Sequence, residues 1–123
     1  MTTNTARGVL LVEDEAILRM LLEDMIEDLG FELAASVDSI DAARAAIAGG
    51  AAIGAAIVDV NLGGEPSFPV ADLLRERQVP FLFSTGYGAE GLPERFREVP
   101  VLAKPYRRDD IHAALRGLLE PAA

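Results

Sequence analysis

The most restrictive feature of this chain is the apolar run from Ala55 to Val60, which a carboxylate, Asp59, interrupts near its end. Small and β-branched residues without polar alternation are typical of a strand buried on both faces of a parallel sheet. Aspartate is a poor strand residue and is costly to bury without a partner. Asp59 therefore has two interpretations: a functional group at the carboxyl edge of the sheet, where open α/β sheets bind ligands, or a cap for the following turn.

Apolar segments of strand character alternate with amphipathic segments along the whole chain. The apolar run from Gly8 to Val12 also ends on acids, and Ser39 and Pro69 are typical first residues of helices. The turn residues between Leu62 and Phe68 argue against regular structure there. Strands are expected at 8–12, 32–37, 55–60, 80–85 and 99–103, and helices at about 17–29, 39–48, 69–77, 93–98 and 109–119.

This alternation predicts a doubly wound α/β fold. We expect a flavodoxin-like, five-stranded parallel sheet of order 2-1-3-4-5 with helices on both faces. One domain is expected to span residues 1–123, with its core at about 8–119. In this topology the ends of the first and third strands lie side by side, so Glu13, Asp14 and Asp59 are predicted to meet.

Composition excludes several classes of function. The 123 residues contain no cysteine and one histidine, His112, so thiolate zinc sites and multi-histidine metal sites are excluded. His112 is expected on a solvated helix surface. The net charge of -9 argues against nucleic-acid binding. No run approaches a membrane span, and the first residues lack the apolar core of a signal peptide, so we expect a cytoplasmic protein without membrane contact.

Three converging carboxylates repel one another unless they share a cation. Magnesium is the natural choice, because it prefers oxygen ligands and is often held by one or two carboxylates and a substrate phosphate. The predicted ligands are Glu13, Asp14, Asp59 and an oxygen of Asn61.

Two further residues at strand ends suit a phosphoryl group. Lys104 is a positive charge that can hold a phosphoryl oxygen, and Thr85 is a hydroxyl that can donate to one. Together with the carboxylates they predict a site for phosphoryl transfer. Taken singly, each residue has a structural alternative, since acids favour helix starts and lysine or threonine are common in loops.

The ordered motifs resemble those of response-regulator receiver domains, the phosphoacceptors of two-component signalling. They are the segment 11–15 after the first strand, Asp59 after the third, Ser84-Thr85-Gly86 after the fourth and Lys104-Pro105-Tyr106 after the fifth. The resemblance implies that Asp59 is phosphorylated, that Glu13, Asp14 and the Asn61 carbonyl help to place Mg²⁺, and that Thr85 is the switching hydroxyl. It also implies that Lys104 binds the phosphoryl group and that the Lys104–Pro105 bond is cis.

Three positions depart from the usual receiver pattern. Val101 stands where receivers often carry the aromatic residue that responds to the switching hydroxyl. The run from Pro80 to Gly88 is similar to the motif of the FATGUY subgroup, with Ser84 in place of alanine, which implies a response carried by residues 86–106 with Tyr87 or Tyr106 as the movable ring. Gly63 replaces a frequent proline and is expected to loosen its loop.

The resemblance implies a phosphoacceptor that catalyses only its own phosphorylation and dephosphorylation, and is otherwise not an enzyme. The expected partners are a sensor histidine kinase or a histidine phosphotransfer protein and a downstream protein target, with the chain a monomer or weak dimer. We expect it to act through protein contacts without an output domain of its own. The alternatives are a small Mg²⁺-dependent phosphohydrolase with Asp59 as nucleophile, or a receiver-like binding module that is never phosphorylated.

Overall fold

The computed structural model describes residues 7–49, 52–86, 91–104 and 106–119, which are organised around one parallel sheet. Its five strands have the order β2-β1-β3-β6-β7, and all neighbouring pairs are parallel. The expected order 2-1-3-4-5 is therefore confirmed. The strands are β1 (Gly8–Val12), β2 (Glu32–Val37), β3 (Ile53–Asp59), β6 (Phe81–Thr85) and β7 (Val101–Ala103).

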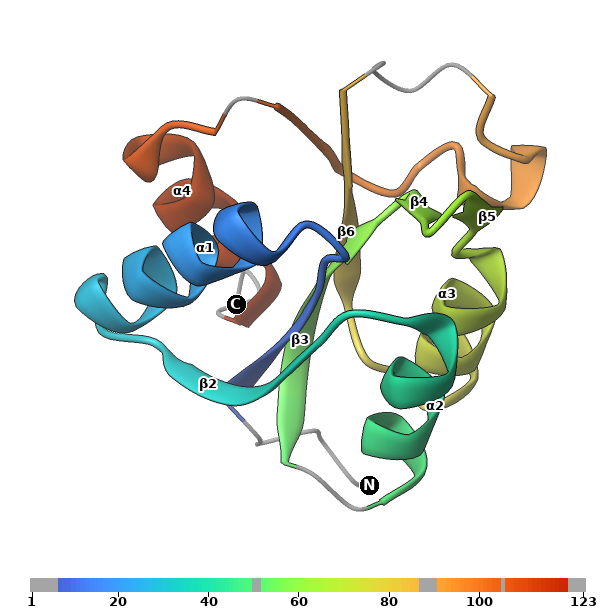
Figure 1. Cartoon of the computed structure of the whole chain (residues 1–123), viewed down its shortest axis with the longest axis horizontal. Helices are drawn as coiled ribbons and strands as arrows, with labels where there is room; N and C mark the ends of the chain where they lie inside the picture. Colours follow the sequence, from blue (N-terminus) through green and yellow to red (C-terminus); the bar gives the residue numbers. More distant parts are fainter. Residues whose placement is uncertain (1–6, 50–51, 87–90, 105, 120–123) are drawn as a thin grey trace.

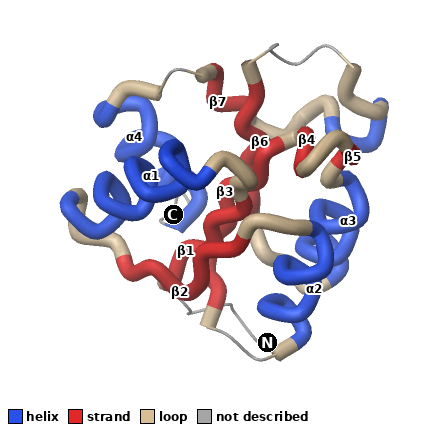
Figure 2. Tube along the Cα trace, viewed as in Figure 1, coloured by secondary structure: helices blue, strands red, loops and turns tan. Residues whose placement is uncertain are grey.

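Helices cover both faces of the sheet, which forms the middle layer in Figure 2. On one face lie α1 (Ala16–Asp28) and α4 (Arg108–Leu119), and on the other lie α2 (Ile40–Ala48) and α3 (Phe68–Glu76) (Figure 1). Because alternate strand residues point to opposite faces, the sheet divides the core into two clusters. Val9, Leu11, Ile57 and Leu82 face α1 and α4, whereas Leu10, Val12, Ala56, Val58 and Phe83 face α2 and α3.

Local sequence explains where several helices begin and end. Ser39 caps α2, since its side chain accepts a hydrogen bond from the Ala42 N–H. Gly30 follows α1 with a φ of 93°, a backbone conformation that favours glycine. Asp109 and Asp110 are of a residue type that often caps helices, but both lie inside the first turn of α4. Acidic side chains are favourable there as well, because they interact with the N-terminal end of the helix dipole.

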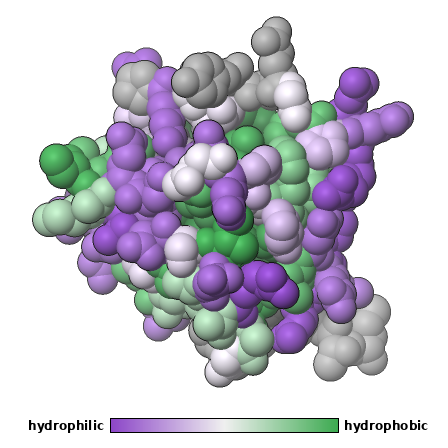
Figure 3. Space-filling model, turned by 45° about the vertical axis from the view of Figure 1, so that its right-hand side comes forward, coloured by the Kyte–Doolittle hydropathy of each residue, from purple (hydrophilic) through white to green (hydrophobic). Residues whose placement is uncertain are grey.

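The exposed side of α1 carries large apolar side chains. Ile17, Met20 and Leu21 are 77%, 60% and 51% exposed. Figure 3 shows hydrophobic and hydrophilic atoms side by side on one face of the molecule. Helical spacing recurs on adjacent stripes of one helix, so the pattern could not show which stripe meets the sheet. The buried stripe is formed by Leu18, Leu22, Met25, Ile26 and Leu29.

The chain between β3 and α3 was expected to be irregular, and this prediction is wrong. It forms a two-stranded antiparallel hairpin of β4 (Asn61–Leu62) and β5 (Glu65–Pro66). The connecting residues Gly63 and Gly64 have φ values of 57° and 87°. Positive φ at both central residues is the geometry of a two-residue hairpin turn, which glycine adopts without strain.

Between β6 and β7 the described chain contains only a short 3₁₀ helix, η1 (Glu94–Phe96), within the range expected for a short helix. Phe96 is fully buried among Phe68, Phe81 and Phe83, with ring centroids 5.5 to 6.2 Å away. Arg95 forms a two-pronged ion pair with Asp72 of α3. This segment is therefore anchored on α3. Residues 87–90 of this connection lie outside the described residues.

His112 was expected on a solvated surface, but it is half-buried, with its ring 5.9 Å from that of Phe31. In the part of the chain that the structure describes, we find no helix with both the length and the apolar character of a membrane span.

Candidate functional site

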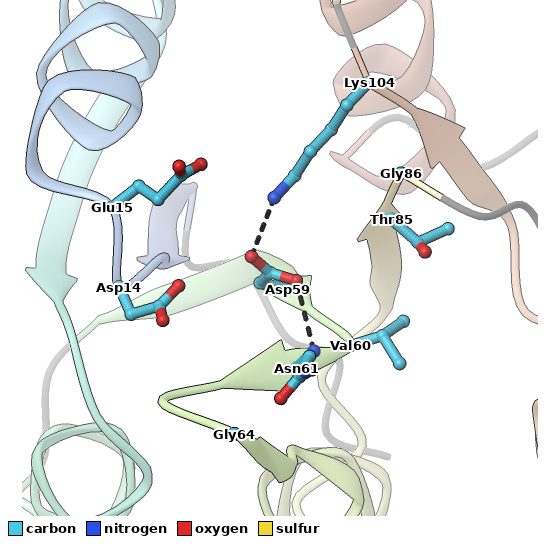
Figure 4. A pocket seen from close by; sticks show the side chains of 9 residues that line it. All are labelled: Asp14, Glu15, Asp59, Val60, Asn61, Gly64, Thr85, Gly86 and Lys104. Carbon is cyan, nitrogen blue, oxygen red and sulfur yellow. Dashed lines mark hydrogen bonds and ion pairs between the residues drawn. The ribbon is translucent and has the colours of Figure 1, made fainter.

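Asp59, the last residue of β3, lies at the centre of a polar pocket at the carboxyl edge of the sheet (Figure 4). The residue is 5% exposed, and both of its side-chain oxygens have partners. Lys104 Nζ donates to Asp59 Oδ2 at 2.8 Å, and the Asn61 N–H donates to Oδ1 at 3.1 Å. The pocket is lined by Asp14, Glu15, Asp59, Val60, Asn61, Gly64, Thr85, Gly86 and Lys104.

The predicted acidic cluster is formed. Glu13, Asp14 and Asp59 each offer an oxygen, and these oxygens lie within 4.8 Å of one another. Glu13 and Asp14 directly follow β1, the neighbour of β3 in the sheet, which explains why residues so distant in sequence meet. Glu13 and Asp59 are buried, whereas Asp14 is exposed.

The environment of Glu13 favours its protonated form when no cation is present. Its side chain is 1% exposed, and burial, together with the charge of Asp59, raises its pKa to about 7. A hydrogen bond from the Glu15 N–H to Glu13 Oε2 and the charge of Lys104 oppose this rise. Among the described residues Glu13 Oε1 has no hydrogen-bond partner, and it lies 3.4 Å from Lys104 Nζ.

Lys104 is the cation of this site. Its Nζ lies between the carboxylates of Asp59 and Glu13, 2.8 and 3.4 Å from their oxygens. Burial lowers the pKa of Lys104, but the hydrogen bond to Asp59 and the charges of Asp59 and Glu13 outweigh burial and raise it above the ordinary lysine value. Even with Glu13 protonated, one ammonium faces the carboxylates of Asp14 and Asp59, which leaves an excess of negative charge. The all-oxygen donor set, with a Glu13 Oε1 that accepts no hydrogen bond from the described residues, fits a hard divalent cation.

The two other predicted residues border the pocket. The Asn61 side chain lies beside Asp59 in Figure 4, and its backbone N–H binds Asp59. Thr85 lines the pocket, but Figure 4 shows its side chain directed away from Asp59. Its backbone carbonyl accepts a hydrogen bond from the Lys104 N–H at 3.0 Å, which links the ends of β6 and β7.

The structure also brings two features to the site that sequence reasoning missed. The Gly63 N–H donates to Asp14 Oδ2 at 2.9 Å, so this glycine is tied to the site in a loop that was expected to be loose. Tyr106 hydrogen-bonds Ser84, the register partner of Asp59 on β6. A backbone donor leaves no signal in a sequence, and the Ser84–Tyr106 pair depends on a contact across the fold. The expected cis bond before Pro105, and Tyr87, lie outside the described residues.

Chemically, this arrangement combines a buried carboxylate held by a lysine with oxygens that suit a divalent cation. A carboxylate so placed can act as a nucleophile toward phosphorus, and the surrounding positive charge can stabilise the equatorial oxygens of a transferring phosphoryl group. The pocket is open to solvent at Asp14 and Glu15, so a donor group can reach Asp59.

Comparisons with known proteins agree with this geometry. The family model of the response regulator receiver domain matches residues 9–116. The solution structure of SdrG from Sphingomonas melonis superimposes with a TM-score of 0.80 at 43% identity, covering 95% of this chain and 99% of that one. The BeF3-activated conformation of SdrG from Pseudomonas melonis gives a TM-score of 0.79 at 44% identity, with 97% and 99% covered.

A curated relative is longer than this chain. The phyllosphere-induced regulator PhyR of Methylorubrum extorquens is 28% identical over 127 residues, which cover 97% of this chain and 46% of PhyR. The chain thus spans about half the length of this relative.

Proposed function

The chain belongs to the response regulator receiver domain family. On this basis we propose that Asp59 is the residue that becomes phosphorylated, with Mg²⁺ as cofactor and a phosphohistidine as donor. One observation carries the proposal: Lys104 Nζ lies 2.8 Å from the buried Asp59 carboxylate, beside the oxygens of Glu13 and Asp14. Family membership favours this function over a phosphohydrolase and over an unphosphorylated binding module. The donor is a sensor histidine kinase or a histidine phosphotransfer protein.

In the proposed reaction, an Asp59 oxygen forms a bond to phosphorus while the phosphorus–nitrogen bond of the donor phosphohistidine breaks. The electron pair of that bond returns to the imidazole nitrogen of the donor. Lys104 offsets the negative charge on the phosphoryl oxygens, and the Asn61 N–H fixes the Asp59 carboxylate in place. When bound, Mg²⁺ supplies further charge neutralisation, and Glu13, Asp14, Asp59 and the Asn61 carbonyl are its proposed ligands.

We propose that phosphorylation changes the conformation of the residues that follow Thr85. We expect the Thr85 side chain to turn toward the new phosphoryl oxygens, which shifts the population of residues 86–106 between two arrangements. Because Val101 replaces the usual aromatic residue, this response depends on other groups in the segment. The signal then passes to a protein target. The cytoplasmic location and the single-domain extent of 1–123 stay predictions.

The direct test is phosphorylation by a small phosphodonor with Mg²⁺, followed by mass spectrometry of the intact protein. We expect one phosphoryl group on the wild-type protein and none on Asp59→Asn. Asp38→Asn is the matched control, since Asp38 is an exposed aspartate just after β2. Labelling of Asp59→Asn at the wild-type level would refute the assignment, and continuous turnover of a phosphomonoester would favour the phosphohydrolase.

A further inference from the structure

The hairpin β4–β5 follows Asp59 directly, and its base is fixed in the core. Leu62 is 4% exposed and belongs to the cluster under α2 and α3. The Ser67 N–H donates to the Val60 carbonyl at 2.8 Å and closes the base of the hairpin. The turn residues at the tip therefore have a defined position relative to the acidic pocket.

One edge of this hairpin presents two backbone donors to two different carboxylates. The Asn61 N–H donates to Asp59 Oδ1 at 3.1 Å, and the Gly63 N–H donates to Asp14 Oδ2 at 2.9 Å. Asn61 belongs to β4, and Gly63 is the first residue of the turn that follows it. Asp14 and Asp59 come from different strands, yet the same short element holds one oxygen of each.

We propose that Gly63 is a positioning residue for cation binding, because its N–H holds the Asp14 carboxylate beside Glu13 and Asp59. This inference rests on the proposed function, in which Asp14 is a ligand of Mg²⁺. Asp14 is exposed and would otherwise sample several rotamers. The hydrogen bond to Oδ2 restricts that freedom and leaves Oδ1 available to the cation.

The identity of residue 63 decides whether this bond exists. A proline at this position has no N–H, and its ring fixes φ near -65°, whereas Gly63 has a φ of 57°. Asparagine keeps the N–H and tolerates positive φ, and Asn-Gly is a favoured pair in such hairpin turns. A Cβ added at Gly63 would meet no atom within 4 Å, so Gly63→Asn fits.

The test compares the wild-type protein with three altered forms of the full chain by titration with Mg²⁺ alone, followed by NMR. Gly63→Asn keeps the donor and the turn, Gly63→Pro removes both, and a semisynthetic protein with an ester at the Gly63 nitrogen removes only the donor. We expect Mg²⁺ affinity to fall about tenfold in the ester and proline forms, as it does when other groups that orient metal ligands are removed. In Gly63→Asn the affinity should stay within about twofold of the wild-type value, because the N–H is kept. In the wild-type protein the Gly63 amide proton should shift upfield as Mg²⁺ withdraws charge from Asp14.

The outcomes separate this inference from the proposed function. An ester form that binds Mg²⁺ as tightly as the wild-type protein overturns the role of Gly63 and leaves the cation site intact. A Gly63 amide signal that does not respond to saturating Mg²⁺ has the same consequence. If the wild-type protein itself fails to bind Mg²⁺, the proposed cofactor and this inference both fail.

Discussion

The hydroxyl groups of Ser84 and Tyr106 are hydrogen-bonded to each other, 22 residues apart in the chain. Ser84 lies beside Asp59 in the sheet register, and Tyr106 follows Lys104 by two residues. The bond therefore joins the end of β6 to the segment that carries Lys104. Burial and the charges of Glu13 and Asp59 raise the pKa of Tyr106, so its phenol stays protonated and can donate.

The Ser84–Tyr106 pair predicts a double-mutant cycle with strong coupling. Ser84→Ala leaves the Tyr106 hydroxyl half-buried without this partner, and Tyr106→Phe does the same to the buried Ser84 hydroxyl. Each single change is expected to lower the free energy of unfolding by about 1–3 kcal/mol. The double variant should lose less than the sum, because no orphaned hydroxyl remains. Urea denaturation measures the free energy of unfolding of the wild-type protein, the two single variants and the double variant. Strictly additive losses would argue against the bond.

Glu13 predicts a pH dependence of stability in the cation-free protein. Between its ordinary pKa of 4.5 and about 7, the folded protein holds a proton at Glu13 that the unfolded chain has released. Glu13 therefore makes stability fall as pH rises through that window.

Glu13→Gln removes this titration. At pH 8 the variant should therefore gain stability over the wild-type protein, by up to about 3 kcal/mol more than any difference between the two proteins at pH 5. Thermal melts at both pH values, with a chelator present, measure the difference. Glu32→Gln, on an exposed position of β2, is the control and should show none. Addition of Mg²⁺ at pH 8 should reverse the wild-type deficit, since the cation binds only the folded, ionised site.

Lys104 is expected to stabilise the fold as well as the reaction. Lys104→Met leaves Glu13 and Asp59 without their cation, and we expect a loss of about 1–3 kcal/mol at neutral pH, below the range for fully buried pairs because Lys104 is partly exposed. The loss should shrink as the pH falls below about 7, where Glu13 takes up a proton and no longer attracts Lys104, and phosphorylation of the variant should be much weaker than that of the wild-type protein. Arg107→Met, an exposed change nearby, is the control, and equal losses in both variants would contradict the prediction.

Phe96 anchors the connection between β6 and β7, so its truncation should be costly. It is fully buried among three other phenylalanine rings, and Phe96→Ala is expected to lower stability by about 3–5 kcal/mol. Hydrogen exchange should then increase at η1 more than at α1 on the opposite face. Arg97→Ala changes an exposed neighbour and should leave both rates unchanged.

The sequence was sufficient for the architecture and for the identity of the acidic site. Apolar runs alternating with amphipathic segments require a parallel sheet covered on both faces, and parallel strands deliver their carboxyl ends to one edge. The meeting of Glu13, Asp14 and Asp59 follows from that rule, and the structure confirms it. Lys104 lies where the same rule places it, 2.8 Å from Asp59. The chemical roles of these residues stay predictions.

Only the tertiary structure decided how the site is held. The exposed stripe of α1 differs from the buried one by its position relative to the sheet, which helical spacing does not encode. The bond from Gly63 to Asp14 spans 49 residues and uses a backbone N–H that every residue except proline possesses. The pairing of Ser84 with Tyr106 likewise depends on where two distant segments meet. Strand patterns are local and repeat along the chain, whereas these contacts arise only when the sheet brings separate loops together.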